Sequence, residues 1–451
     1  MSDPGAPAPL ASADEARAHI LAAVHGPTEA EWVHLVDALG RVVAAPIAST
    51  TDLPPWDNSA MDGYAIRSSD VDAATEAAPL RLNVEGDVAA GSDPASVTVR
   101  RGTAARIATG APIPAGADAV VPVELTTPAD NDGRPSGPRG RELSDPAPAA
   151  ILVHASVPAG ASIRRKGGDL RAEAVVLDAG AVVTPAAVAI AAGAGHDGLL
   201  VHRRPVVGVL ATGDELRQPG TNLGPAGIPD ANGPALWALA LDAGGDPRSL
   251  GIAGDRPEDV RARLCAGLAE RPDAIIVSGG VSVGPYDHVR AAFAELGTVD
   301  LWRVAVQPGK PFAFGTAPRP GGGPPVLLFG LPGNPVSTFV TFELFVRPAL
   351  RRLGGHPRVA RPTERAILAD ETPKGGGRRA YVRVRADRDS QGSIVRDATG
   401  RPTVRLVGGV RGQGSHVLSA LAAAEGLAVI PETIDVHPAG GEVELWWLDR
   451  S

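Results

Sequence analysis

Apolar residues in the middle of the chain form short runs that are separated by segments with helical spacing. Apolar runs begin at Val206, Ala274 and Val326, and each is typical of a strand that is buried on both faces. The segment 257–271 has the spacing of a helix. Strands that alternate with helices predict right-handed crossovers and a parallel sheet covered on both faces. We therefore expect an α/β domain over residues 205–355.

Two other regions alternate apolar and polar residues at the period of a β-strand. Between residues 80 and 123, short strand-like segments are separated by Gly, Pro and Asp, which predicts a small β domain. Alternation returns beyond residue 360 and predicts a C-terminal β-barrel. Residues 124–150 are rich in proline, glycine and charge, and this composition predicts a mobile insertion.

The first part of the chain is predicted to form a scaffold. Residues 12–15 have the spacing of a capping box at the start of a helix. A second helix is expected at 32–39 and a strand at 41–47, and residues 170–200 return to an alanine-rich helix-and-strand pattern. Because the β domain interrupts these segments, we infer that it is inserted into one elongated domain. The predicted domains are 12–53 with 170–204, 54–169, 205–355 and 360–451.

Composition limits the classes of protein that fit. The 451 residues are 44% hydrophobic and 21% charged, the balance of a soluble multidomain protein. A net charge of −8 argues against a general nucleic-acid surface, and the absence of a run of about eighteen apolar residues argues against a membrane span. Cys265 is the single cysteine. We expect its thiol to pack in a core, and we expect a cytoplasmic protein without a disulfide framework.

Three carboxylates follow three of the predicted strands. Glu215, Asp255 and Asp287 each lie at or shortly after a carboxyl end, and in a parallel sheet these ends meet at one edge, where ligands bind. A single acid in such a position is usually a helix cap. Three that converge predict metal binding or catalysis.

Glycine interrupts the chain where the strand at 274–278 ends. Gly279, Gly280 and Gly284 allow the backbone to turn tightly and to present N–H groups to an anion, and Ser282 adds a hydroxyl. An ordinary strand-to-helix turn is the alternative interpretation. A carboxylate such as Asp287 repels a phosphate there unless a cation such as Mg²⁺ lies between them.

Other polar positions have the character of anion sites. Lys310 follows a Pro-Gly break between two predicted strands, and Asn334 before a proline predicts a helix start whose N–H groups lie near Ser337. The three cations at 164–166 precede two glycines and Asp169. They form either a solvated turn, which is the commoner case, or an anion clamp.

Six segments of the chain carry a further signal when they are taken together: 57–65, 108–121, 212–216, 278–287, 308–315 and 330–337. Together they resemble one family, the molybdopterin molybdenumtransferases of molybdenum cofactor biosynthesis (the MoeA and gephyrin E-domain family). The resemblance implies Mg²⁺-dependent insertion of molybdate into adenylylated molybdopterin with release of AMP. It also implies an elongated homodimer whose active site lies between the molybdopterin-binding-like α/β domain of one subunit and the inserted β domain of the other. The preceding adenylyltransferase and downstream molybdoenzymes are the implied protein partners.

The resemblance also assigns site residues. Mg²⁺ is implied at Asp287 with Glu215, and phosphate binding at the turn 279–284. Lys310 and the helix start at Asn334 are implied to hold molybdate. Gln307 departs from the pattern, because many members have lysine there; Arg303 is an open candidate to replace the lost charge. The family's acidic positions fall on Asp62, Asp169, Glu215, Asp255 and Asp287, other site positions on Thr109 and Arg164, a molybdate pocket on Lys310, Pro311 and Ser337, and a second anion site on Arg383 and Ser415.

Three alternatives remain at this stage. The first is an adenylyltransferase that acts one step earlier, whose single domain resembles residues 205–355; the β domains on either side argue against it. The second is a receptor-clustering scaffold protein, which usually needs an additional domain and a long linker. The third is a general sugar-phosphate or nucleotide enzyme.

Overall fold

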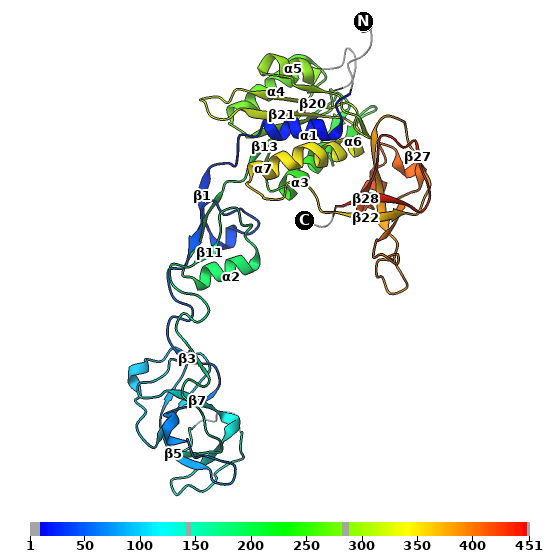
Figure 1. Ribbon diagram of the computed structural model, residues 1–451. Helices are drawn as coiled ribbons and strands as arrows, with labels where there is room; N and C mark the ends of the chain where they lie inside the picture. Colours follow the sequence, from blue (N-terminus) through cyan, green and yellow to red (C-terminus); the bar gives the residue numbers. More distant parts are fainter. Residues whose placement is uncertain (1–9, 141–145, 282–287, 449–451) are drawn as a thin grey trace.

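The computed structural model describes residues 10–140, 146–281 and 288–448 of an elongated molecule. The α/β region and the C-terminal barrel lie side by side at one end, and the inserted β region lies at the other (Figure 1). The N-terminal scaffold connects the two ends. Among the described residues, no helix combines the length and apolar character needed to cross a bilayer.

A six-stranded sheet forms the centre of the α/β region, and four of its strands are parallel as predicted. The two strands at one edge are antiparallel to their neighbours, because the connections between them are too short for a crossover helix. In sheet order the strands are β16 (Asp246–Ala253), β13 (Val206–Thr212), β17 (Ala274–Ser278), β21 (Val326–Leu331), β20 (Ala313–Ala317) and β18 (Leu301–Trp302).

Helices cover both faces of this sheet (Figure 1). Alternation along β17 shows why: Ile276 packs into the core on one face, while Ile275 and Val277 pack into the core on the other. The first face carries α1 (Ala13–Ala22), α3 (Asn232–Asp242) and the continuous helical segment α6 (Pro335–Thr341), η5 (Phe342–Val346) and α7 (Arg347–Leu353); the second carries α4 (Pro257–Ala269) and α5 (His288–Leu296).

The prediction for Cys265 was wrong. Its side chain lies exposed on α4 instead of in a core. Val260, Leu264 and Leu268 occupy the inward stripe of this helix at spacings of four residues, and Cys265, one residue beyond Leu264, is turned away from that stripe.

The scaffold differs from its prediction in two elements. Residues 32–39 do not form a helix: β1 (Ala30–His34) pairs antiparallel with β12 (Gly198–His202), and η1 (Leu35–Asp37) is a short 3₁₀ turn. Of the strand expected at 41–47, the structure keeps isolated bridges of Val42 and Val43 and, at its end, Ile47 as the first residue of β2 (Ile47–Ala48). Pairing partners that are distant in sequence decide both cases. The remaining scaffold elements are β11 (Val175–Leu177) and α2 (Pro185–Gly193).

The start of α1 agrees with its prediction. Ser12 Oγ accepts a hydrogen bond from the backbone N–H of Glu15 at 3.2 Å, and the Glu15 carboxylate accepts the Ser12 N–H at 2.9 Å. This capping box fixes the first turn of the helix.

The inserted β region contains a six-stranded sheet, and part of the segment expected to be mobile belongs to it. Thr126 and Thr127 are buried in β8 (Thr126–Ala129), which pairs with β9 (Ala150–Val153), so the prediction of a mobile insertion was wrong for this part. Buried β-paired threonines favour a strand despite the polar composition around them. The sheet order is β7 (Ala119–Pro122), β4 (Gly63–Ile66), β6 (Thr103–Ile107), β5 (Leu80–Val88), β9 (Ala150–Val153) and β8 (Thr126–Ala129).

Five strands close into a C-terminal barrel, because β24 (Arg379–Ala386) pairs with both β25 (Thr403–Leu406) and β26 (Gly426–Ile430). A sixth short strand, β19 (Val306–Gln307), reaches over from the α/β region and pairs with β24. The barrel order is β24 (Arg379–Ala386), β25 (Thr403–Leu406), β22 (Thr363–Leu368), β28 (Gly441–Trp447) and β26 (Gly426–Ile430). Shorter elements of the chain are β3 (Asn58–Ser59), β10 (Ile163–Arg164), β14 (Leu216–Arg217), β15 (Ile228–Pro229), β23 (Thr372–Pro373), β27 (Val436–His437), α8 (Leu418–Ala422), η2 (Ser68–Asp70), η3 (Pro94–Ser96), η4 (Val123–Leu125) and η6 (Val410–Gln413).

Candidate active site

A cavity of about 680 Å³ lies beyond the carboxyl ends of β13, β17 and β21. This is the sheet edge where parallel α/β sheets bind ligands. The structure brings together there seven of the residues that the sequence predicted as site residues: Glu215, Asp255, Gly279, Gly280, Pro311, Asn334 and Ser337.

The glycines of the turn are required by close packing. Gly279 has φ +93°, and a Cβ there would lie 2.5 Å from the carbonyl oxygen of Thr212. Gly280 has φ +66°, and a Cβ there would lie 2.8 Å from a methyl group of Val289. Any larger residue would push the turn away from β13 and α5 and so change the floor of the cavity.

Glu215 is held by a similar close approach. A Cβ at Gly213 would lie 2.6 Å from Oε2 of Glu215, so the carboxylate folds back over the glycine. The absence of a side chain at Gly213 therefore decides where this carboxylate lies in the cavity.

Asp255 has a structural contact as well as a place in the cavity. Its Oδ2 accepts the backbone N–H of Asp214 at 3.1 Å, and Oδ1 of Asp214 accepts the backbone N–H of Asp255 at 3.1 Å. This reciprocal pair joins the loops after β13 and β16. Sequence reasoning missed Asp214, whose signal was its place beside Glu215 at a strand end.

The start of α3 contributes residues that sequence reasoning also missed. Asp230 Oδ1 accepts the backbone N–H groups of Asn232 and Gly233, at 3.0 and 2.9 Å. Asn232 donates from Nδ2 to Ser278 Oγ at 2.8 Å and to the Gly333 carbonyl at 2.7 Å. These bonds join three strand ends around the cavity. An Asp two residues before a helical pattern is the signal that could have found Asp230.

Asn334 occupies the N-cap position of α6 as predicted, but its side chain does not cap the helix. Its Nδ2 donates to Ser415 Oγ at 3.1 Å instead, and the Val336 N–H donates to the Ser415 carbonyl at 3.1 Å. The barrel loop that carries Ser415 thus contacts the helix start, and its neighbour His416 lines the cavity.

Arg383 is fully buried in the barrel behind this loop. Nη2 donates to the carbonyls of Gly412 and Gly414, at 2.7 and 3.1 Å, but Nε and Nη1 have no partner among the described residues. Burial lowers its pKa to about 10. A buried guanidinium with two unused donors is a group that an anion would stabilise.

The predicted oxyanion residues lie at different depths. Ser337 is buried, whereas the Lys310 side chain is exposed and its neighbour Pro311 lines the cavity. The side-chain carbonyl of Gln307 is buried without a hydrogen-bond partner in the part of the chain that the structure describes.

A second group of predicted residues lies on the inserted β region. Asp62 Oδ1 accepts hydrogen bonds from the backbone N–H and the hydroxyl of Thr109, at 2.6 and 2.8 Å, and these bonds lower the pKa of Asp62. Arg164 and Asp169 are exposed on the same region. Within one chain this group lies at the opposite end of the molecule from the cavity (Figure 1).

Ser282, Gly284 and Asp287 lie outside the described residues. Among the described residues, no group of three or more His, Cys, Asp or Glu side chains is arranged to hold a metal. Glu215 and Asp255 supply carboxylate oxygens to the cavity, and this is the donor type that Mg²⁺ prefers.

Comparison with known proteins identifies the family. Family models match the chain as "MoeA N-terminal region (domain I and II)" over 11–195, "Probable molybdopterin binding domain" over 208–352 and "MoeA C-terminal region (domain IV)" over 365–448. Molybdopterin molybdenumtransferase 2 of Mycobacterium tuberculosis H37Rv is 37% identical and covers 92% of this chain and 94% of its own. The chain belongs to the molybdopterin molybdenumtransferase family.

Further relatives in this family support the assignment. The molybdopterin molybdenumtransferase of Nostoc is 38% identical over 78% of this chain and 76% of its own. The crystal structure of a molybdopterin biosynthesis MoeA protein from Pyrococcus horikoshii is 28% identical, with a TM-score of 0.73, and covers 97% of this chain and 100% of that one. The family match spans both β regions as well as the α/β region, which argues against a single-domain adenylyltransferase.

Proposed function

We propose that this protein inserts molybdate into adenylylated molybdopterin, with Mg²⁺-dependent release of AMP, as a step of molybdenum cofactor biosynthesis. The observation that carries the proposal is the cavity in which Glu215 and Asp255 lie with the glycine turn 279–280. Family membership supports the same reaction.

The residues have complementary roles in this reaction. The Gly279 N–H donates to the Leu331 carbonyl at 3.0 Å, so the Gly280 N–H is the donor of the glycine turn that would bind a phosphate oxygen. Glu215, with Asp287, would hold Mg²⁺. When bound, Mg²⁺ supplies positive charge that offsets the charge of the phosphoanhydride as AMP leaves. Without it, Glu215 and Asp255 repel the anionic substrate.

Molybdate would bind beside the start of α6. Lys310, Asn334 and Ser337 supply an ammonium, an amide and a hydroxyl there, and Arg383 with Ser415 forms the second anion site behind them. Gln307 brings no charge, so we expect weaker oxyanion binding than in relatives with lysine at this position.

The two separated groups of site residues would meet in a homodimer. Asp62, Thr109, Arg164 and Asp169 of one subunit would complete the cavity of the other. A set of exposed apolar side chains on the scaffold provides a face for the second subunit: Trp32, Val36, Leu39 and Leu200, which are 52%, 84%, 53% and 38% exposed.

We also propose the domain limits 12–53 with 170–204, 54–169, 205–355 and 360–451, a cytoplasmic location, and transfer of the product to downstream molybdoenzymes.

The test of the reaction uses purified protein with adenylylated molybdopterin, molybdate and Mg²⁺. We expect AMP and active cofactor to appear together, and only with the metal. Asp287→Ala should abolish AMP release without unfolding the protein, whereas Glu258→Ala, at an exposed acid on α4, should leave it unchanged. AMP release by Asp287→Ala at the wild-type rate would refute the metal assignment.

A further inference from the structure

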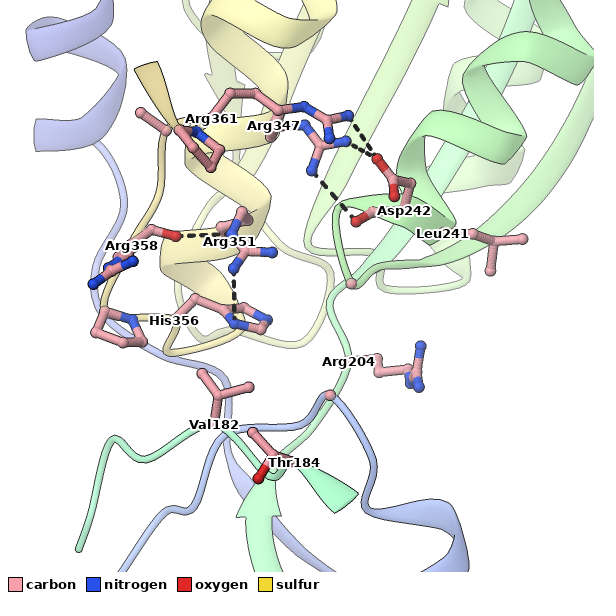
Figure 2. A pocket seen from close by; sticks show the side chains of 15 residues that line it. Val182, Thr184, Arg204, Leu241, Asp242, Arg347, Arg351, His356, Arg358 and Arg361 are labelled. Carbon is pink, nitrogen blue, oxygen red and sulfur yellow. Dashed lines mark hydrogen bonds and ion pairs between the residues drawn. The ribbon is translucent and has the colours of Figure 1, made fainter. Parts of the chain in front are cut away.

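A second cavity, of about 770 Å³, lies where three parts of the chain meet (Figure 2). The scaffold contributes Val182 and Thr184, the end of α3 contributes Asp242, and the segment into the barrel contributes His356 and Arg358. The cavity shares no lining residue with the candidate active site, and the proposed reaction does not use it.

The charge around this cavity is strongly positive. Two of its arginines form ion pairs with carboxylates. The buried Glu343 lies 2.7 Å from Arg347 and 2.9 Å from Arg361, and Asp242 lies 2.7 Å from Arg361, measured from carboxylate oxygen to guanidinium nitrogen. The remaining arginines have no carboxylate partner among the described residues. The five arginines that line the cavity are Arg204, Arg347, Arg351, Arg358 and Arg361.

Arg351 lies at the centre of this excess charge (Figure 2). Its Nε donates to the Arg358 carbonyl at 2.8 Å and its Nη2 donates to Nδ1 of His356 at 3.3 Å. Burial, and then repulsion by Arg347 and Arg361, lower the pKa of Arg351. The guanidinium groups of Arg204 and Arg358 have no hydrogen-bond partner within the described chain, so they are available to a ligand.

His356 adds a neutral donor. Burial, together with Arg351 and Arg204, lowers its pKa to about 4, so the ring is neutral at pH 7. Arginine can only donate, so Nδ1 accepts from Arg351 and the ring proton lies on Nε2. A Cβ at Gly244 would lie 3.2 Å from Nε2, so a residue larger than glycine at this position would crowd the N–H.

We propose that this cavity binds a tetrahedral oxyanion with two negative charges, held by Arg204, Arg351 and the Nε2–H of His356. Planar guanidinium groups match the oxygens of such an anion with pairs of N–H donors. The anion would offset the repulsion among the arginines. It would also link the scaffold, the α/β region and the segment that leads into the barrel.

Calorimetric titration of the full-length protein with inorganic phosphate, at constant ionic strength in chloride, tests the proposal. We expect saturable binding to the wild type. Arg351→Gln and Arg204→Gln should each weaken binding about tenfold or more. Arg352→Gln changes an adjacent exposed arginine that does not line the cavity, and it should bind as the wild type does. If Arg351→Gln fails to fold, Arg204→Gln carries the test.

Two further titrations identify the source of the oxyanion. AMP and molybdate would also bind in the proposed active site, so each titration is repeated with Arg204→Gln. AMP binding that is tighter than phosphate binding and is weakened by Arg204→Gln would indicate the phosphoryl group of a nucleotide. Molybdate binding with the same two properties would indicate a free inorganic oxyanion; both results support the site. Absence of saturable binding would overturn the proposal. Equal binding by the wild type and both glutamine variants would overturn it too, because the anion would then bind elsewhere.

Discussion

The side chain of Asn334 donates a hydrogen bond from Nδ2 to Oγ of Ser415, at 3.1 Å, and so joins the start of α6 to the C-terminal barrel. The contact connects the cavity edge of the α/β sheet to the loop in front of the buried Arg383. The barrel is therefore positioned to shape the cavity, although Ser415 itself does not line it.

The first prediction concerns this contact. Ser415→Ala removes one hydrogen bond, which is worth about 0.5–1.5 kcal/mol, so the KM for molybdate should rise roughly three- to tenfold with a smaller change in kcat. Steady-state kinetics measure both constants. Ser419→Ala, at an exposed serine on α8, should behave as the wild type. An unchanged KM in Ser415→Ala would show that the contact does not influence molybdate binding.

The second prediction concerns the glycine under Glu215. Gly213→Ala places a methyl group against the carboxylate and should lower kcat roughly tenfold to hundredfold. Gly220→Ala is the matched control, because Gly220 has φ +83° with nothing within 4 Å of an added Cβ. It should lower the Tm through backbone strain but keep kcat. Equal loss of kcat in both variants would indicate strain rather than displacement of the carboxylate.

Sequence patterns predicted the α/β region well because its signals are local. Each strand at Val206, Ala274 and Val326 is identified by its own apolar run, and the rule that parallel strand ends meet at one edge placed Glu215 and Asp255 in one cavity. The antiparallel direction of the two edge strands was not predicted. It depends on the short segments that connect these strands, and the hydrophobic periodicity of a strand does not indicate its direction.

Other features depend on contacts between distant residues and could not be predicted from local pattern. The apolar spacing of Trp32 and Val36 fits a helix, but Trp32 pairs with Leu200 in a sheet. The bond from Asn232 to the Gly333 carbonyl spans 101 positions, and nothing near Asn232 in the sequence indicates it. The lack of partners for two nitrogens of Arg383 likewise follows only from the packing of the barrel.

The third prediction concerns pH. The pKa of His356 is lowered to about 4 in the folded protein, against an ordinary value near 6.5 in the unfolded chain. Between these values the unfolded chain binds a proton that the folded protein does not, so stability falls as the pH falls through this window. The loss should approach about 3 kcal/mol. Urea unfolding in chloride buffer measures it.

The matched variants separate this residue from others that titrate. His356→Gln should have a shallower decline in stability between pH 6.5 and 4 than the wild type. His25→Gln, at an exposed histidine, should follow the wild-type curve. Parallel curves for His356→Gln and the wild type would contradict a neutral, buried His356.

The fourth prediction concerns the apolar face of the scaffold. Val36 is 84% exposed in the single chain, and Val36→Glu places a charge in the face proposed to contact the second subunit. Light scattering should show a monomer, with loss of activity. Val395→Glu, at an exposed valine of the barrel, should remain a dimer. A dimeric Val36→Glu would exclude this face as the interface.

The most direct test of the shared active site is complementation between two inactive variants, Asp62→Ala and Glu215→Ala. A purified heterodimer of the two has one active site with both substitutions and one with neither, if each site takes Asp62 from one subunit and Glu215 from the other. We predict that the heterodimer recovers about half of the wild-type AMP release, while each homodimer is inactive. A heterodimer as inactive as its parents would contradict a site built from two subunits.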